Sequence, residues 1–387
     1  MLKSKKNILL YTRPIIPPWD EASKNLAYDI AINMPKNQFE ISLLTPKKSA
    51  FNQELVEKYP YIKPEKIYSS PTLNLKEKIQ LLLRLFKFRL NTDLIHFLFT
   101  PRSITSFLIR LRLKFSKVKT VQTVATLSKK NLKNSKKLKK ILFADTIIVQ
   151  SKNTYQQLKN KGLEKIKLIY PGINLEKYQP AQKDAETLKK LKLKISDFVV
   201  LYTGEYTRLK ASDDIVEALK ILFKDYPQMD NLKFIFACRI KSKKDRTKKT
   251  KIIKTLEKES LLNRIIFLDT FSEMEKLYNI SDINIFPVQE MAGKFDTPLT
   301  LVESMACGKP IIVSKLKNLK ELTGNNAFGL ICKRKSPRDL AQKIHLLKTD
   351  KKLYNRIAKA GLTFVENNFD IKTNIKKYNE IYKELLK

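Results

Sequence analysis

The chain has 387 residues, of which 43% are hydrophobic, and its 77 Lys and Arg against 38 Asp and Glu give a formal net charge of +39. This length and apolar fraction exclude a disordered chain and predict two globular domains. Two explanations of the charge stay open. Either the composition is Lys-rich throughout, or the protein meets an anionic partner such as nucleic acid, anionic lipid or a phosphorylated acceptor.

Few residues are suited to hold a disulfide or a metal. Cys238, Cys307 and Cys332 are far apart and odd in number, which predicts a reducing compartment. With two histidines in the chain, a zinc site is not expected either. The apolar run Ile8–Tyr11 is too short for a signal peptide, and no uncharged apolar stretch approaches the length of a transmembrane helix. We therefore expect a cytoplasmic protein.

Short apolar runs alternate with helical patterns in the first part of the chain. Strands are predicted at Asn7–Thr12, Phe39–Leu44, Asp93–Phe99, Lys119–Val124, Thr146–Gln150 and Ile166–Ile169. Helices are predicted at Asp20–Asn33, Lys76–Leu90 and Ser103–Lys114. This alternation is typical of a doubly wound parallel sheet.

The same alternation restarts after the turn-rich stretch Tyr170–Pro180. Strands are predicted at Phe198–Thr203, Leu232–Ala237, Arg264–Leu268, Ile283–Phe286 and Pro310–Val313. The sequence thus predicts an α/β protein with two Rossmann-like domains, residues 1–175 and 176–370, which face each other across a cleft. A last helix, residues 371–387, is a candidate to return to the first domain.

Several common site motifs are missing from the sequence. The dinucleotide fingerprint G-x-G-x-x-G, the Walker A loop and the G-x-S-x-G elbow do not occur. Their absence argues against a nicotinamide enzyme, a P-loop NTPase and an α/β-hydrolase.

The most informative segment is Lys294–Val313, KFDTPLTLVESMACGKPIIV. Pro298 is suited to the start of a helix, and Gly308 to its left-handed end. The amides near Leu299, Thr300 and Leu301 would then form a helix N-terminus, which binds phosphate. Glu303, one turn further, is placed to accept hydrogen bonds from sugar or ribose hydroxyls. The competing interpretation is an ordinary core helix with one exposed glutamate.

A second segment, LYTGEYTRLKASDDIVEALK at residues 201–220, follows a predicted strand. Gly204 permits close approach of a ligand at the strand end. Arg208 and Lys210 bring two cations into one short loop, where they would offset the charge of a departing diphosphate. A solvated loop in a Lys-rich chain is the alternative. Arg239, directly after another predicted strand, is a further candidate for substrate binding.

Together with the exit of the first domain, these segments resemble the family 4 glycosyltransferases of the GT-B fold. The exit, ADTIIVQSKNTYQQLKNKGLEKIKLIYPGINLEKYQP, is similar to that family's A-D-x-I-I-V-x-S…P-G-I-(D/N)…P pattern. Residues 204–210 resemble its Gly-Arg-Leu-x-x-x-Lys loop, and residues 294–310 its Glu-x7-Glu element. The likeness covers nearly all of the second domain and is weaker over residues 1–90.

The resemblance implies a retaining hexosyltransferase that uses a nucleoside-diphosphate sugar, usually without a metal or other cofactor. It implies that the donor binds mainly to the second domain and the acceptor to the first. Lys210 matches the family lysine that holds the diphosphate, and Glu303 the glutamate that bonds the ribose. The family arginine falls on Glu205, so we take Arg208 as its substitute.

Three departures from the family pattern concern the site. The first glutamate of Glu-x7-Glu falls on Phe295, and we take the adjacent Asp296 as its replacement for contact with the sugar hydroxyls. A glycine-rich loop after the first strand is replaced by residues 19–23, which makes Trp19 and Asp20 candidate binding residues. The family histidine after a T-V pair falls on Ala125. His96 is a candidate to face the cleft in its place, or it is an ordinary core histidine.

Residues 81–140 are rich in Lys and Arg, with Asp93 as their one acidic residue. Within them, LLLRLFKFRL and FLIRLRLKF mix large apolar residues with cations, as basic amphipathic helices on an anionic membrane do. This pattern predicts peripheral attachment to the inner face of the cell membrane and a lipid-linked or membrane-proximal glycan acceptor. Two core helices with basic outer faces are the alternative. A basic nucleic-acid-binding protein and an inactive GT-B-like scaffold are the competing functions.

Overall fold

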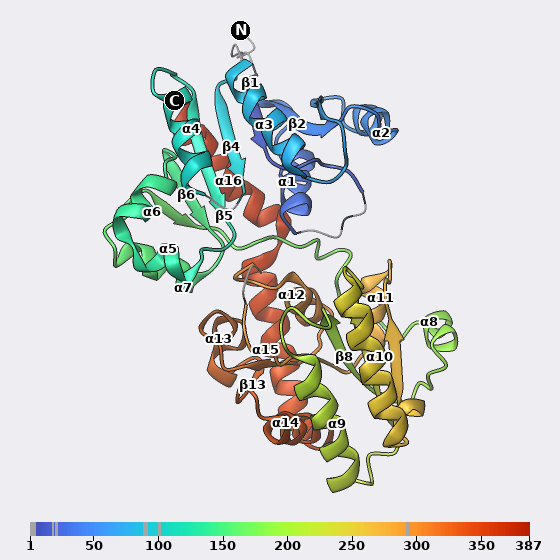
Figure 1. The fold of residues 1–387 in the computed structure, drawn as a ribbon. Coiled ribbons are helices and arrows are strands. Elements are labelled where there is room, and N and C mark those ends of the chain that lie inside the picture. The colour runs from blue at the N-terminus through green and yellow to red at the C-terminus, as the bar shows by residue number, and fades with distance from the viewer. Residues whose placement is uncertain (1–4, 18, 20–21, 88–91, 100–101, 292–294) are drawn as a thin grey trace. The chain divides into compact units, whose positions relative to one another are not determined.

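The computed structural model describes all residues except 1–4, 18, 20–21, 88–91, 100–101 and 292–294. The chain forms two compact units (Figure 1). Unit 1 comprises Met1–Gly172 and Ile371–Lys387, and unit 2 comprises Ile173–Asp370. The chain therefore passes between the units after residues 172 and 370, whereas the sequence analysis put the divisions after residues 175 and 370.

Unit 1 is built on a seven-stranded parallel sheet with the order β3-β2-β1-β4-β5-β6-β7. Its strands are β1 (Lys6–Tyr11), β2 (Phe39–Pro46), β3 (Ile62–Tyr68), β4 (Leu94–Leu98), β5 (Lys119–Val124), β6 (Thr146–Val149) and β7 (Ile166–Leu168). Its helices are α1 (Ala22–Asn33), α2 (Phe51–Lys58), α3 (Leu75–Lys87), α4 (Ser103–Leu113), α5 (Lys129–Lys133), α6 (Ser135–Ile141), α7 (Lys152–Lys159) and α16 (Ile371–Leu386).

Unit 2 is built on a six-stranded parallel sheet with the order β10-β9-β8-β11-β12-β13. Its strands are β8 (Phe198–Gly204), β9 (Leu232–Cys238), β10 (Ile265–Leu268), β11 (Ile283–Phe286), β12 (Ile311–Ser314) and β13 (Leu330–Cys332). Its helices are α8 (Ala185–Lys190), α9 (Ser212–Asp225), α10 (Lys243–Lys258), α11 (Met274–Ile280), α12 (Leu299–Ala306), α13 (Lys317–Thr323), α14 (Pro337–Thr349) and α15 (Lys351–Phe369), with 3-10 turns η1 (Leu262–Arg264) and η2 (Gly324–Asn326). Two doubly wound α/β domains, as predicted, are thus present.

Strand β3 was missed by the sequence analysis for a physical reason. Its sequence, IKPEKIY, lies at the edge of the sheet, and only its two terminal residues are buried. An edge strand needs one apolar face at most and tolerates proline, so its sequence lacks the apolar run used to recognise the central strands.

The last helix, α16, completes the core of unit 1. Its buried residues Ile371, Ile375, Tyr378, Ile381 and Tyr382 belong to one cluster with apolar residues of α1, β1 and β2. In Figure 1 this helix, coloured red, lies among the elements of unit 1 although it follows the whole of unit 2 in the sequence. Unit 1 is therefore incomplete without the last residues of the chain.

His96 is part of this packing, which corrects its assignment as a candidate to face the cleft and supports the alternative, an ordinary core histidine. It lies in the middle of β4, paired with Leu10, and is completely buried. Its Nδ1 lies 2.6 Å from the Tyr382 hydroxyl and its Nε2 lies 2.7 Å from the Thr123 hydroxyl. Desolvation lowers the pKa of the imidazole to about 3, so the ring stays neutral. His96 is a core histidine and not a substrate-binding residue.

Gly172 is the last residue of the first segment of unit 1, and it lies against Ile371, the first residue of α16. A Cβ atom at this position would lie 2.6 Å from the Cα of Ile371, inside the contact distance of two carbon atoms. We expect Gly172→Ala to lower the free energy of unfolding by about 1–3 kcal/mol, because backbone has to move to admit the methyl group. Chemical denaturation measures this change.

Gly361→Ala in α15 is the matched control. Its Cβ would lie 3.3 Å from its nearest neighbours, one of them the flexible end of Met305, and alanine favours a helix. A loss of stability at residue 172 no larger than at residue 361 would contradict the close approach of Gly172 and Ile371.

Candidate active site

The sheet of unit 2 reverses its direction of growth between β8 and β11. The chain adds β9 and β10 on one side of β8 and then returns to place β11 on the other side. All neighbours are parallel, so the loops that follow β8 and β11 leave the same edge of the sheet. Ligands of open α/β sheets bind in the crevice at such a reversal, outside the carboxyl ends of the strands. The predicted Gly204–Lys210 loop and the segment leading to α12 both start at this point.

Strand β8 ends with a glycine that is required sterically. A Cβ atom on Gly204 would lie 2.4 Å from the ring of Tyr202, which folds back over the strand end. The register pairs Gly204 with Cys238 at the end of β9. The predicted binding residue Arg239 therefore leaves the sheet directly beside this loop.

Glu205, at the position of the expected arginine, is buried with an exposed fraction of 4%. Its carboxylate lies 3.6 Å from the guanidinium of Arg208 and 3.4 Å from the ammonium of Lys241. A buried carboxylate needs such partners to offset its desolvation. Arg208 thus lies where predicted but is partly neutralised by Glu205, and Lys241 is a second cation of the site that the sequence analysis did not select.

Lys210 has a left-handed backbone conformation with φ +54°, so its side chain leaves the end of a tight turn. Its ammonium lies 3.1 Å from a carboxylate oxygen of Glu290, and both side chains are well exposed, at 61% and 41%. Exposed ion pairs contribute little free energy. A phosphate group can therefore replace Glu290 as the partner of Lys210 at low cost.

One backbone hydrogen bond joins the loops after β8 and β11, and side-chain hydrogen bonds add to it. The Gln289 amide donates to the Leu209 carbonyl over 3.0 Å, and the Gln289 side chain donates to Asp214 in α9. In addition, the Asn284 side chain of β11 donates to the carbonyl of Thr300 in the first turn of α12. The two predicted segments therefore form one connected structure at the edge of the sheet.

Helix α12 begins as the sequence predicts. Pro298 is its N-cap residue, with an extended backbone, and no side chain of the described residues caps the first turn. The prediction for Leu301 needs correction, because its amide already donates to the Pro298 carbonyl and its side chain is completely buried. The amides of Leu299 and Thr300 remain the candidate donors to an anion.

Asp296 and Glu303 flank the start of this helix. Asp296 is buried, with an exposed fraction of 6%. Glu303 is half-buried, and its carboxylate accepts a 2.8 Å hydrogen bond from the Tyr278 hydroxyl of α11. Desolvation raises the pKa of Glu303 from an ordinary 4.5 to about 7, against the opposing effects of the Tyr278 hydrogen bond and the charge of Lys177. Such a carboxyl is suited to hydroxyl recognition, and Tyr278 was not foreseen as its partner.

The other predicted site residues lie in unit 1. Trp19 is 38% exposed and stacks on Tyr28, with ring centroids 4.4 Å apart. Asp20 lies outside the described residues. Across the described part of the chain, no group of three or more His, Cys, Asp and Glu side chains is arranged to hold a metal ion.

Comparison with known proteins identifies the two units. The model of Glycosyltransferase Family 4 matches residues 24–177, and that of Glycosyl transferases group 1 matches residues 183–363. A D-inositol 3-phosphate glycosyltransferase of Streptomyces bingchenggensis is 24% identical over 58% of this chain and 49% of its own length. An N,N'-diacetylbacillosaminyl-diphospho-undecaprenol alpha-1,3-N-acetylgalactosaminyltransferase of Campylobacter jejuni is 26% identical over 56% of this chain and 54% of its own length. The chain thus spans about half the length of these relatives.

Solved structures share the fold along the whole chain. Anabaena HepE in complex with UDP superposes with a TM-score of 0.76 at 18% identity, over 98% of this chain and 100% of its own. A glycosyltransferase of Rickettsia africae superposes with a TM-score of 0.75 at 22% identity, over 99% of both chains. The architecture is therefore GT-B, two Rossmann-like domains in one chain. With both family models matched in order, the protein belongs to the family 4, group 1 glycosyltransferases.

The raised pKa of Glu303 predicts how stability depends on pH. The folded protein holds the Glu303 proton more tightly than the unfolded chain does, so the free energy of unfolding falls as pH rises from about 4.5 to about 7 and then levels off. Glu303→Gln keeps an acceptor for Tyr278 but does not ionise. We expect its unfolding free energy to rise relative to the parent by about 3 kcal/mol between pH 4.5 and pH 8.

Denaturant unfolding of both proteins across this pH range measures the difference. Glu257→Gln, on the exposed side of α10, controls for loss of one negative charge. A constant difference between the Glu303→Gln variant and the parent at all pH values would contradict the raised pKa.

Proposed function

We propose that the protein is a retaining glycosyltransferase that transfers a sugar from a nucleoside-diphosphate sugar to a lipid-linked or membrane-proximal glycan acceptor. The main support for this proposal is that the Arg208–Lys210 loop and the start of α12 are connected through hydrogen bonds at the reversal of strand order between β8 and β11. Cations and free helix amides at one place suit a diphosphate. The solved complexes of Anabaena HepE with UDP and with UDP-glucose support the same donor class.

In the proposed mechanism, the donor diphosphate lies between the ammonium of Lys210, the guanidinium of Arg208 and the amides of Leu299 and Thr300. Negative charge on the departing diphosphate grows as the bond to the sugar breaks, and fixed positive groups stabilise that charge. Lys210 exchanges Glu290 for a phosphate oxygen as the donor binds. Arg208 shares its charge between the phosphate and Glu205.

Two carboxyl groups orient the donor in this proposal. Glu303 accepts hydrogen bonds from the ribose hydroxyls while Tyr278 holds its carboxylate in place, and Asp296 accepts from the sugar hydroxyls. Retention of configuration would follow from attack on the same face as the leaving group, with a donor phosphate oxygen taking the acceptor proton. This course is what the family resemblance implies.

The site assignment predicts the effect of removing its cations. Lys210→Ala and Arg208→Ala are each expected to lower turnover of the nucleotide sugar by about 10²–10³-fold, because each removes charge from the leaving group. A mass-spectrometric screen of nucleotide sugars, beginning with UDP-glucose, identifies the donor, and release of nucleotide measures the rate.

Lys243→Ala, in the exposed first turn of α10, is the control for loss of one positive charge. Turnover that is the same in Lys210→Ala, Arg208→Ala and Lys243→Ala would sink the site assignment. The absence of turnover with every nucleotide sugar would instead favour an inactive scaffold.

The acceptor part of the proposal is supported by helices α3 and α4 of unit 1, which pack against each other. Each has a stripe of exposed apolar residues at helical spacing, and Phe115 continues the second stripe. These residues are 51–89% exposed: Leu75, Ile79 and Leu83 in α3, and Ile104, Phe107, Leu111 and Phe115 in or after α4. A continuous group of exposed apolar side chains on a globular protein marks a contact surface.

The charges around the apolar stripes support an anionic lipid surface as the proposed partner. Arg102, Arg110 and Lys114 are exposed on or beside α4, and such cations attract acidic headgroups. Arg84 is not available in this way, because it forms a 2.7 Å ion pair with Glu65. No described helix is long and apolar enough to cross a bilayer. The diphospho-undecaprenol acceptor in the name of the Campylobacter jejuni relative supports a lipid-linked acceptor.

Vesicle sedimentation tests this surface. We expect the protein to bind phosphatidylglycerol-containing vesicles at physiological salt, and the triple variant Ile104→Ser, Phe107→Ser, Leu111→Ser to bind about tenfold more weakly or less, because its apolar contact is lost. Ile195→Ser removes an exposed apolar residue of unit 2 and is the control. The membrane proposal fails if the parent ignores such vesicles, or if the triple variant binds as well as the parent.

A further inference from the structure

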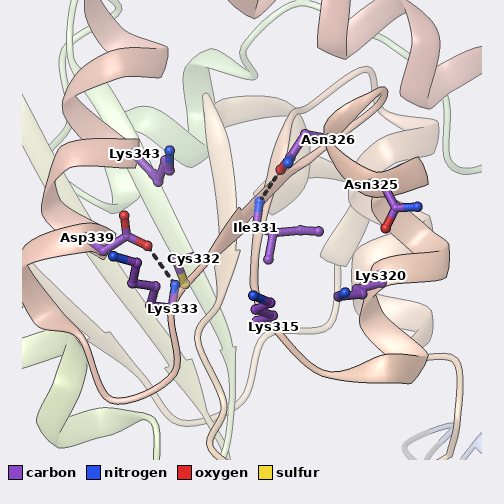
Figure 2. Close-up of a pocket in the computed structure, with 9 residues that line it drawn as sticks. All are labelled: Lys315, Lys320, Asn325, Asn326, Ile331, Cys332, Lys333, Asp339 and Lys343. Atoms are coloured by element: carbon purple, nitrogen blue, oxygen red, sulfur yellow. Dashed lines mark hydrogen bonds between the residues drawn. The ribbon is translucent and has the colours of Figure 1, made fainter.

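A second group of positively charged residues lies at the carboxyl ends of strands in the unit 2 sheet, further along the sheet from the proposed donor site. A pocket of about 320 Å³ opens where β12 and β13 end, bounded by α13, η2 and α14 (Figure 2). The strand order places it between β12 and β13, two strand positions from the β8–β11 reversal. Adjacent strands are about 4.8 Å apart. The pocket is therefore on the same edge as the proposed donor site but centred on other strands.

Four lysines line this pocket. Lys315 follows β12, Lys320 belongs to α13, Lys333 follows β13 and Lys343 lies in α14. Figure 2 shows Lys333 and Lys343 on the α14 side and Lys320 on the opposite, α13 side. The positive groups thus reach the pocket from separate elements of the fold and not from one run of sequence.

The one carboxylate in the pocket, Asp339, offsets only part of the charge of these lysines. Asp339 accepts a 2.6 Å hydrogen bond from the backbone amide of Lys333, and its own amide donates to Ser336 at the start of α14. None of the four pocket lysines forms an ion pair within 4.0 Å with a residue that the structure describes. Lys210 and Lys241, near the proposed donor site, each have a carboxylate partner. With four lysines against the one carboxylate of Asp339, the lining of the pocket stays positively charged, and this favours the binding of an anion.

The backbone around the pocket is held in place before any ligand binds. The Lys315 amide donates to the Cys332 carbonyl over 2.9 Å, which fixes the ends of β12 and β13 together. The Ile331 amide donates to the side-chain oxygen of Asn326 over 2.7 Å and so ties η2 to β13. With the bond from Lys333 to Asp339, each wall of the pocket is joined to its neighbour. A preformed site loses less free energy to ordering when it binds.

We propose that this pocket binds a small phosphorylated ligand, a diphosphate or a sugar phosphate, at a site separate from that of the donor diphosphate. A volume of about 320 Å³ suits a ligand of this size. Ammonium groups on opposite walls suit a ligand with two or more negative charges, because each phosphate oxygen then meets a donor. Ile331 between the lysines offers a short apolar surface for the face of a sugar ring.

Calorimetric titration with inorganic pyrophosphate tests the proposal. Because the proposed donor site also takes pyrophosphate, the full chain carrying R208Q and K210Q is the starting protein. This background isolates the pocket from the proposed function. We expect this protein to retain one pyrophosphate site. Adding K320Q and K343Q is expected to lower the affinity of that site for pyrophosphate at least tenfold, which is about the effect of losing a charge-assisted contact.

Two controls make the result specific. K243Q with K244Q, in the exposed first turn of α10, removes the same charge elsewhere in unit 2 and is expected to change pyrophosphate affinity less than twofold. K320Q with K343Q in the otherwise unchanged chain is expected to leave UDP affinity within about twofold. If K320Q with K343Q unfolds the protein, K315Q with K333Q, which alters two exposed side chains, takes its place.

The proposal is overturned if the R208Q, K210Q protein binds no pyrophosphate, or if the pocket variant and the α10 control bind it equally. Two further arms separate the sources of the phosphate. Binding of soluble glucose 1-phosphate that is lost in the pocket variant identifies a free sugar phosphate. Binding of phosphatidate vesicles that is lost in the same variant identifies a lipid headgroup.

Discussion

The reversal of strand order between β8 and β11 is the constraint on which the proposed chemistry depends. In a parallel sheet every carboxyl end lies at one edge, and only at the reversal do two neighbouring loops diverge to leave room for a ligand. Here one loop carries Arg208 and Lys210, and the other leads to the uncapped first turn of α12. The hydrogen bond from Gln289 to Leu209 holds the loops in register. The cations and the helix amides are thus brought together by topology and not by proximity in sequence.

The charged residues at the carboxyl ends of β8 and β11 are not a simple cluster of cations, because carboxylates lie among them. A buried glutamate, Glu205, stands between Arg208 and Lys241, while Glu290 partners Lys210 in solvent. The ligand-free site is therefore close to neutral, although the chain carries a net charge of +39. A diphosphate has to compete with these carboxylates, and it competes more easily for the exposed Lys210 than for Arg208. Lys210 is the residue that we expect to dominate recognition of the donor.

Much of the fold followed from sequence because central parallel strands are buried on both faces and read as apolar runs. Elements without that signal, such as the edge strand β3, were missed. At the site, the strand-end glycine Gly204 and the helix start at Pro298 follow from local rules. The partners of Glu303 and Glu205 do not follow from local rules. Tyr278 and Lys241 lie 25 and 36 positions away from them in the sequence and contact them only through packing of the fold. The sequence left two interpretations of His96 open for the same reason, since α16, from the other end of the chain, packs against it.

The most direct test of the account is a crystal structure of the chain with UDP bound. The account predicts the diphosphate outside the carboxyl ends of β8 and β11, with a phosphate oxygen within hydrogen-bonding distance of the Lys210 ammonium and of the Leu299 or Thr300 amide, and with Glu290 released from Lys210. Nucleotide bound elsewhere, with the contact between Lys210 and Glu290 intact, would contradict it.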